Sequence, residues 1–179
     1  MVNFQLRAVQ PEDAGAVAEI YRPAVLTGTA SFEIEPPDAA EFERRMAAIV
    51  DAGFPYVVAE QGGVVIGYGY ANAYRPRPAY RWSVEDSIYL APAAQGQGVG
   101  RVLLEHLIGT TARLGFRQMV AVIGDSARDP SIPLHRACGF HFAGTLHSIG
   151  YKGGRWLDGV LMQRALGQGD RTPPAEPLA

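Results

Sequence analysis

Hydrophobic and polar positions along the chain form short alternating or apolar segments that are typical of β-strands. The first is residues 4–8, and residues 56–60 and 64–74 are rich in β-branched and aromatic side chains. The last two segments flank Gln61-Gly62-Gly63, so a hairpin is expected there. Further strands are expected at residues 87–90, 118–123, 140–147 and 156–163, the last two closing around Lys152-Gly153-Gly154.

Apolar residues recur at helical spacing in the segments between these strands. Residues 11–22 begin with Pro, Glu and Asp and end before Pro23, which predicts a helix over that range. A second helix is expected after Asp38, which forms a capping-box pattern with Glu41. The remaining helices are expected over residues 101–114 and 130–138.

The order of these elements predicts the class of fold. Two strands pair before a glycine-rich stretch at residues 95–100, and strands alternate with helices after it. Such an order favours an α/β fold with one mixed sheet and helices on its faces. We expect a single domain over residues 1–166. Residues 167–179 combine Pro, Gly and charge without periodicity and are expected to be disordered.

Composition narrows the class of partner. The chain has 179 residues, 47% of them hydrophobic, which is enough to fill one core, and its net charge of −2 gives no positive field for nucleic acid or anionic lipid. We expect a small-molecule partner. No apolar run reaches the length of a membrane span, the N-terminus lacks the order of a signal peptide, and Cys138 has no second cysteine to pair with. These features favour the cytoplasm.

The stretch Gln95-Gly96-Gln97-Gly98-Val99-Gly100 falls where a strand ends and a helix begins. Free amide N–H groups at a helix start bind anions such as a pyrophosphate. A Rossmann fingerprint would need glycine where Arg101 stands, and a P-loop would need Lys-Ser/Thr after Gly100. The stretch is therefore either a different phosphate-binding loop or a plain glycine-rich turn.

The remaining pattern, Gln-x-x-Gly-x-Gly, resembles the pyrophosphate loop of the GNAT superfamily of acetyl-CoA-dependent N-acetyltransferases. Three further segments resemble the phosphinothricin acetyltransferase subfamily, so the resemblance extends over roughly residues 4–165. These segments are Arg81-Trp82-Ser83-Val84-Glu85-Asp86-Ser87-Ile88-Tyr89-Leu90, Met119-Val120-Ala121-Val122-Ile123-Gly124 and Gly150-Tyr151-Lys152-Gly153-Gly154-Arg155-Trp156-Leu157-Asp158.

The resemblance implies a GNAT fold and direct transfer of an acetyl group from acetyl-CoA to the amine of a small amino-acid-like compound. Phosphinothricin, methionine sulfoximine and methionine sulfone are the acceptors typical of the subfamily. The resemblance also implies that the main chain of Ile88, Tyr89 and Leu90 pairs with the pantetheine arm, and that a backbone N–H near Tyr89 or Leu90 donates to the oxyanion. Arg101 either contacts a CoA phosphate or is solvated. The residues implied at the pyrophosphate are Gln95, Gly96, Gln97, Gly98, Val99 and Gly100.

An amine must lose a proton before it attacks a thioester, and a carboxylate can accept that proton directly or through water. Glu85 stands where the resembling family carries its proposed base. The alternative is a solvent-facing carboxylate on a half-exposed strand. Strand alternation sends the side chain of Asp86 to the opposite face.

The departing thiolate of CoA would be helped by a proton donor. The resemblance places His135 at that position, either as an acid or relay or in a structural hydrogen bond. It also implies that Ser131 contacts pantetheine or caps the short helix. The family usually carries asparagine three residues before this serine, where the chain has Arg128. Arg128 therefore either replaces the usual contact or lowers cofactor affinity.

A zwitterionic acceptor needs a cation for its carboxylate. Arg75 and Arg77 lie in a proline loop beside Tyr80, before the Glu85 strand, and an arginine fork suits a carboxylate, phosphinate or sulfone. The alternative is two solvated arginines. Phe32 matches a family position that lines the acceptor pocket and is also expected to pack in part.

Other chemistry receives less support from the sequence. Cys138 is expected to be a small buried hydrophobe, and the four histidines show no metal-ligand spacing, so no metal is expected. Two other functions remain open at this point: an acyl-CoA sensor without turnover, and an acetyltransferase for a peptide N-terminus or polyamine. The resembling enzymes are commonly homodimers, so a homodimer is expected.

Overall fold

The computed structural model of the protein describes residues 3–124 and 130–174. Its centre is one seven-stranded sheet with the strand order β1-β2-β3-β4-β5-β7-β6. Every neighbouring pair is antiparallel except β4 and β5. The strands are β1 (Gln5–Ala8), β2 (Tyr56–Gln61), β3 (Val64–Ala73), β4 (Ser83–Leu90), β5 (Gln118–Gly124), β6 (His141–Lys152) and β7 (Arg155–Ala165). The mixed α/β fold expected from the sequence is confirmed.

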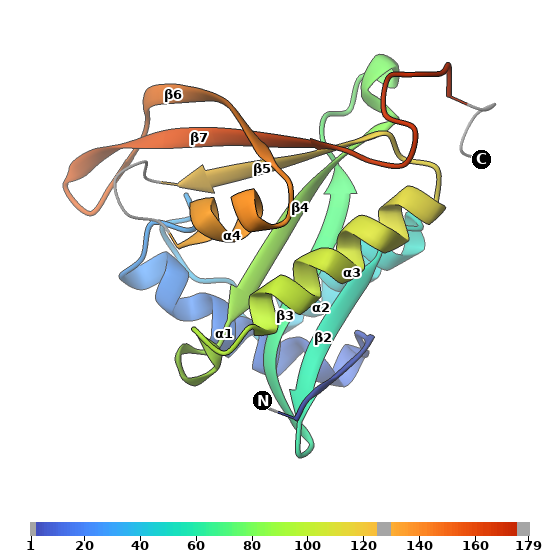
Figure 1. Ribbon diagram of the computed structural model, residues 1–179. Helices are drawn as coiled ribbons and strands as arrows, with labels where there is room; N and C mark the ends of the chain where they lie inside the picture. The colour runs from blue at the N-terminus through green and yellow to red at the C-terminus, as the bar shows by residue number, and fades with distance from the viewer. Residues whose placement is uncertain (1–2, 125–129, 175–179) are drawn as a thin grey trace.

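Helices cover both faces of this sheet (Figure 1). One pair, α1 (Ala14–Leu26) and α2 (Ala39–Asp51), lies behind the sheet in that view, and α3 (Val99–Arg113) crosses its front. The short α4 (Ser131–Ala137) lies on the same side as α3, beside β5. Single 3₁₀ turns precede α1, β4 and the glycine-rich stretch, at Pro11–Asp13, Pro78–Tyr80 and Pro92–Ala94.

Two hydrophobic cores follow from this arrangement. The larger lies between α3 and the sheet and includes the fully buried Leu103, Leu107 and Met119. The other lies under α1 and α2 and is rich in stacked tyrosines, among them Tyr56 and Tyr68. Burial of apolar side chains contributes about 25 cal/mol per Å² on each face, so both helical layers are held to the sheet.

Local signals in the sequence explain several element boundaries. The Asp38 carboxylate accepts a hydrogen bond from the N–H of Glu41 at 2.8 Å, which caps α2 as expected. Gly62 and Gly63 both have positive φ, 57° and 81°, in the turn between β2 and β3. A two-residue turn of this kind closes an antiparallel hairpin and strongly favours glycine.

The predicted end of the first helix is wrong, and the strand expected at residues 87–90 begins earlier, at Ser83. The first helix does not end before Pro23 but continues as α1 to Leu26. Proline removes one N–H from the helix, yet the Pro23 carbonyl accepts from the N–H groups of Thr27 and Gly28, and Val25 in the last turn is 1% exposed. Packing of that turn outweighs the missing hydrogen bond.

The closing strands are longer than predicted, because β6 and β7 extend to the Gly153-Gly154 turn. After β7, residues 167–174 form turns in which Arg117 donates to the carbonyls of Gly169 and Pro173. The division into a domain over 1–166 and a disordered tail over 167–179 stays a prediction, and residues 175–179 lie outside the described part. Within the described ranges, no helix has both the length and the apolar character needed to span a bilayer.

Candidate active site

The parallel pair at the centre of the sheet separates into a fork. Pairing of β4 with β5 runs from Ser83 opposite Gln118 to Asp86 opposite Ala121. Beyond that point β4 continues to Leu90 along β3, and β5 continues along β7. The β5-facing edge of β4 after Asp86 therefore has no strand partner, and its peptide groups are available to a ligand.

A cavity of about 650 Å³ opens at this fork. Its walls come from the end of α1, the end of β4, the glycine-rich turn and the start of α4, which are far apart in the sequence. This volume suits an extended ligand. The residues that line it are Ile20, Pro23, Ala24, Thr27, Gly28, Thr29, Ala30, Ile88, Tyr89, Leu90, Pro92, Gln95, Gly96, Gly98, Gly100, Arg101, Pro130, Ser131 and Leu134.

The glycine-rich turn presents backbone to the cavity. Gly96 and Gly98 have φ of 71° and 84°, and a Cβ on either would meet no atom within 4 Å. These glycines are therefore required by backbone conformation rather than by packing. Gly98 is the N-cap of α3, whose first N–H groups have no partner within the helix. The turn fits a pyrophosphate group.

Most cofactor residues expected from the sequence line this cavity: Ile88, Tyr89, Leu90, Gln95, Gly96, Gly98, Gly100, Arg101 and Ser131. The Gln97 amide instead donates to the Ala93 carbonyl, and Val99 is fully buried in the core under α3. Arg101 forms an exposed ion pair with Glu105 at 2.8 Å, so it is solvated as well as near the cavity. Arg128 lies outside the described residues.

Glu85 is half-buried on β4, directly before the fork. Burial raises its pKa to about 7, the charge of Asp86 adds to this, and the charge of Arg75 opposes it. Across the strand pair it lies opposite Asn72 of β3. A carboxyl group with this pKa exchanges a proton readily at neutral pH.

On the opposite face of β4, Asp86 meets His135 of α4. Asp86 Oδ2 lies 3.0 Å from His135 Nε2, and His135 Nδ1 lies 2.7 Å from the Ser131 carbonyl oxygen. Both side chains are at least 95% buried and line a narrow gap of about 40 Å³ where β4 and β5 separate. Sequence reasoning misses this role of Asp86, because its partner is 49 residues away and no local pattern links the two.

The residues expected at the acceptor lie in two groups. Arg75 stacks over the Tyr74 ring, 5.2 Å from its centroid, and its charge acts on Glu85. Tyr80 packs edge-on against the same ring at 5.7 Å. Arg77 is exposed at the start of the 3₁₀ turn, and its charge is not among the causes that shift the pKa of Glu85.

Phe32 belongs to residues 27–33, a segment that we call the bridging segment because it spans the open end of the fork. On the β4 side, the Tyr89 hydroxyl donates to the Ala30 carbonyl at 3.3 Å. On the β5 side, a Cβ on Gly124 would collide with the Thr29 carbonyl oxygen and would lie 3.3 Å from the Phe32 ring. Sequence reasoning assigns Phe32 to the site but misses Thr27 to Ala30 as part of the cavity wall.

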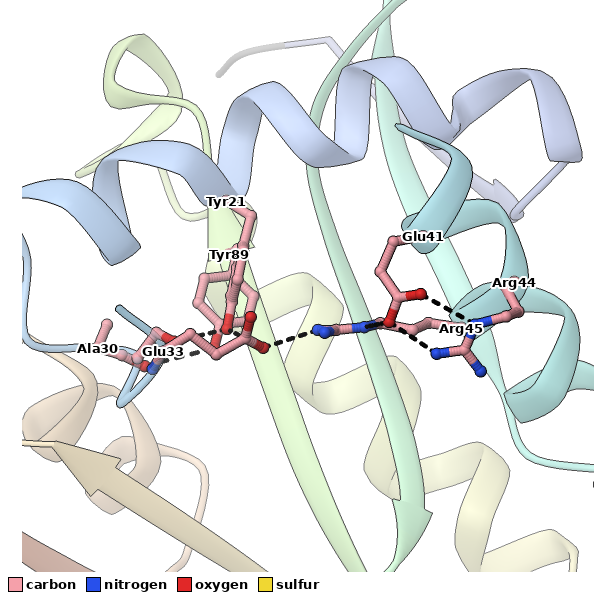
Figure 2. A network of polar contacts seen from close by, with 8 residues as sticks. Tyr21, Ala30, Glu33, Glu41, Arg44, Arg45 and Tyr89 are labelled. Atoms are coloured by element: carbon pink, nitrogen blue, oxygen red, sulfur yellow. Dashed lines mark hydrogen bonds and ion pairs between the residues drawn. The ribbon is translucent and has the colours of Figure 1, made fainter. Parts of the chain in front are cut away.

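Polar contacts tie the bridging segment to α1 and α2 (Figure 2). The Tyr21 hydroxyl lies 2.6 Å from the Ser31 hydroxyl and 3.2 Å from a Glu33 carboxylate oxygen. Arg45 donates to the same Glu33 oxygen at 2.7 Å. The end of the bridging segment, next to the residues that line the cavity, is therefore held by side chains of both helices.

Metal and thiol chemistry find little support near the fork. Within residues 3–124 and 130–174, no group of three or more His, Cys, Asp or Glu side chains could hold a metal ion. Cys138 is buried, and that burial raises the pKa of its thiol. A thiol in this environment is a poor nucleophile.

Known proteins share this architecture and much of the sequence. Residues 6–161 match the family described as "Acetyltransferase (GNAT) domain". The phosphinothricin N-acetyltransferase of Alcaligenes faecalis is 53% identical over 169 residues, covering 94% of this chain and 86% of that enzyme. The L-methionine sulfoximine/L-methionine sulfone acetyltransferase of Salmonella typhimurium is 38% identical over 165 residues, covering 90% and 94%.

A solved structure adds the ligand that the fork fits. The GNAT superfamily phosphinothricin acetyltransferase of Sinorhizobium meliloti, in complex with AcCoA, has a TM-score of 0.93 and 50% identity, covering 97% of this chain and 94% of that one. Acetyl-CoA as co-substrate, expected from the glycine-rich turn, is thereby supported. The chain belongs to the GNAT acetyltransferase family and is an acetyl-CoA-dependent N-acetyltransferase.

Proposed function

We propose that this enzyme acetylates the primary amine of phosphinothricin, methionine sulfone, methionine sulfoximine or a closely similar amino acid. Its relatives at 53% and 38% identity carry the names of these acceptors. The observation that carries the proposal is Glu85, a half-buried carboxyl group with a pKa of about 7 beside Arg75 at the mouth of the fork. A base and a cation together suit an amine that bears an acidic group.

Glu85 is the general base in this proposal. The acceptor amine transfers a proton to the Glu85 carboxylate, directly or through water, and its nitrogen then attacks the thioester carbonyl. The C–N bond forms, the C–S bond breaks, and the CoA thiolate leaves. A pKa of about 7 leaves much of Glu85 ionised at neutral pH and able to accept that proton.

The Asp86 and His135 pair supplies a proton on the other face of β4. His135 Nε2 and Asp86 Oδ2, 3.0 Å apart, line the narrow gap that continues the cofactor cavity past Ser131. In this proposal the His135 ring turns from its Asp86 contact to protonate the departing thiolate, and Asp86 orients the ring before that step. A backbone N–H near Tyr89 or Leu90, beyond the last residue of β4 that pairs with β5, is the proposed donor to the oxyanion.

Cofactor and acceptor bind on different parts of the fork. The glycine turn at Gly96 and Gly98 holds the pyrophosphate, and Ser131 contacts the pantetheine arm. Arg75 pairs with the carboxylate, phosphinate or sulfone oxygens of the acceptor, and Phe32 forms an apolar wall. Arg77 and Tyr80 complete the acceptor loop. Their contribution is expected to be smaller, since the charge of Arg75 reaches Glu85.

Release of CoA from acetyl-CoA tests the proposal. The protein is assayed against phosphinothricin, methionine sulfone, methionine sulfoximine, unmodified amino acids, polyamines and peptides. The expected result is turnover with the first three, with kcat/KM at least tenfold above that of any peptide or polyamine. If a peptide or polyamine were the preferred acceptor, the proposed class of acceptor would be wrong. Tight acetyl-CoA binding with no release would indicate a sensor.

We also propose that the enzyme is a homodimer that pairs through the β6–β7 side of the sheet. The edge strand β6 and its hairpin expose large apolar side chains, including Ile149, Tyr151 and Trp156, the last 63% exposed. Sedimentation should give twice the chain mass for the native protein and a monomer for Ile149→Asp. The matched control is Val64→Asp, at a similarly exposed apolar position on β3, which should stay dimeric. A cytoplasmic location remains a proposal resting on the sequence alone.

A further inference from the structure

Lys152 is the only lysine among the 16 lysine and arginine residues of the chain. It lies at the end of β6, in the Gly150 to Asp158 segment, whose role the acetyl-transfer chemistry does not explain. Its Nζ donates to the Ala24 carbonyl at 3.0 Å and to the Ser31 carbonyl at 2.6 Å. One ammonium group thus joins the end of β6 to two points more than 120 residues away in the sequence.

The two carbonyl groups define what Lys152 holds. Ala24 lies in the last turns of α1, and Ser31 lies in the bridging segment directly before Phe32. Hydrogen bonds from an ammonium group are about twice as strong as those between neutral groups. The Lys152 amine is half-buried, and burial lowers its pKa. Lys152 therefore closes the loop from α1 to Phe32 from the β6 side.

Gly150, on the same strand, forms the seat for Phe32. A Cβ on Gly150 would lie 2.5 Å from Phe32 Cε1, so any larger residue would displace the ring. Gly124 at the end of β5 approaches the other part of the ring. The position of the Phe32 ring is therefore set by the two strands, and that of its backbone by Lys152.

The cofactor side of the bridging segment has separate anchors. Ala30 is held by the Tyr89 hydroxyl, and the Thr29 carbonyl packs on Gly124. Tyr21 of α1 and Arg45 of α2 contact the Glu33 carboxylate (Figure 2), and the Tyr21 hydroxyl also lies 2.6 Å from the Ser31 hydroxyl. Loss of the Lys152 contact would therefore act mainly on Ser31 and Phe32, because Ala30 and Thr29 keep their contacts with Tyr89 and Gly124. Ala24, which lines the cofactor cavity, stays in place as part of α1.

We propose that Lys152 is a positioning residue that, together with Gly150, fixes Ser31 and Phe32 and so determines which acceptors the enzyme accepts. This inference rests on the proposed function only in placing Phe32 at the acceptor. Lys152 itself does not touch the reacting atoms. It acts through the main chain of the bridging segment.

The first test is Lys152→Met, which keeps the apolar stem and removes the ammonium group. The KM of the acceptor should rise about tenfold while the KM of acetyl-CoA stays within about twofold. The ratio of kcat/KM for phosphinothricin to that for methionine sulfone should change by about threefold or more. Arg22→Met, which removes an exposed cation from α1, is the control and should change neither. An equal rise in both KM values, or no rise, would overturn the proposal.

The second test keeps the lysine and moves the ring. Gly150→Ala should alter the same acceptor ratio, and the effect should vanish in a Phe32→Ala background, where no ring is left to displace. Gly144→Ala is the matched control, because it lies on the same strand and its Cβ would meet nothing within 4 Å. If Gly150→Ala still altered the acceptor ratio in the Phe32→Ala background, Gly150 would not act by positioning the Phe32 ring.

The third test does not require turnover, so it separates this inference from the proposed function. An amine-reactive reagent followed by mass spectrometry reports Lys152 alone among side chains, with the chain's N-terminal amine as reference. Native protein should react at Lys152 roughly tenfold or more slowly than unfolded protein, because the hydrogen bonds to the two carbonyls shield the amine by more than its lowered pKa favours reaction. Equal rates would mean that the two carbonyls do not hold the amine, whatever the acceptor proves to be.

Discussion

His135 Nε2 lies 3.0 Å from Asp86 Oδ2 in a region where both side chains are almost fully buried. The other ring nitrogen, Nδ1, lies 2.7 Å from the Ser131 carbonyl oxygen, which can only accept a hydrogen bond. Both ring nitrogens of His135 are therefore engaged, one by the main chain of α4 and one by the Asp86 carboxylate. The two contacts fix the orientation of the imidazole ring beside the fork.

Asp86→Asn should disrupt this contact without changing side-chain volume. An amide in place of the carboxylate cannot orient the imidazole ring in the same tautomer or support its transfer of a proton, so we expect kcat to fall by about 10²-fold or more while the KM of acetyl-CoA changes little. Steady-state kinetics with both substrates varied would measure this.

The chain provides a matched control for that substitution. Asp158 lies 3.2 Å from the ring of His147, which is 78% exposed, so the same chemical pair occurs at the surface. Asp158→Asn should leave kcat unchanged. If both variants lost activity equally, or neither did, the catalytic role of the buried pair would be refuted.

Glu85→Gln should remove one limb of the pH profile. The pKa of Glu85 is raised to about 7, so the carboxylate that can accept a proton is the minor form below that pH and the major form above it. In the native enzyme, kcat/KM should therefore rise through about pH 7. The glutamine variant should lose this limb and about 10²-fold or more of kcat, because an amide accepts no proton. A rise at higher pH from the acceptor amine itself should remain.

Glu43→Gln provides the reference for this experiment. Glu43 is an exposed carboxylate on α2, and its loss should leave the profile intact. Retention of the limb near pH 7 in Glu85→Gln would assign that limb to another group and end the case for Glu85 as the base.

Arg75 and Arg77 should differ when each is changed to glutamine. The positive charge of Arg75 lowers the pKa of Glu85, so its removal should move the acidic limb of kcat/KM to higher pH and leave less of the base at pH 7. The KM of the acceptor should rise in the same variant. Arg77→Gln should leave the limb in place. If the acidic limb shifted equally in both variants, the charges of Arg75 and Arg77 would act equally on Glu85, and Arg75 would have no distinct role.

Several parts of this site could be predicted from the sequence, because each depends on the conformation of a few consecutive residues. The glycine-rich turn before α3 and the alternation that separates Glu85 from Asp86 are properties of a few consecutive residues. Resemblance to a family then placed Glu85, His135 and Phe32. In the structure, the glycine-rich turn lines the cofactor cavity and His135 lines the narrow gap that continues it. Glu85 lies on β4 directly before the fork.

The missing parts depend on contacts between distant segments. Asp86 gains its meaning from α4, and Lys152 from carbonyl groups near the start of the chain. A main-chain carbonyl accepts a hydrogen bond whatever the side chain is, so the residue types at Ala24 and Ser31 could not predict the contact with Lys152. The helix through Pro23 is a similar case, since the burial of Val25 overrides the local effect of proline.

Gly98→Ala separates backbone conformation from stability at the cofactor turn. Its φ of 84° costs an alanine about 1–2 kcal/mol, and relief of that strain would tilt the first N–H groups of α3 away from the pyrophosphate. The KM of acetyl-CoA should rise about tenfold with the acceptor KM little changed. Gly63→Ala supplies the comparison: its φ is 81°, its Cβ would also meet nothing within 4 Å, and it lies in the β2–β3 turn. Thermal melts should show similar destabilisation in the two variants. Only Gly98→Ala should weaken the binding of acetyl-CoA. If the two variants had the same KM for acetyl-CoA, the glycine-rich turn would only connect the strand to the helix and would not bind the cofactor.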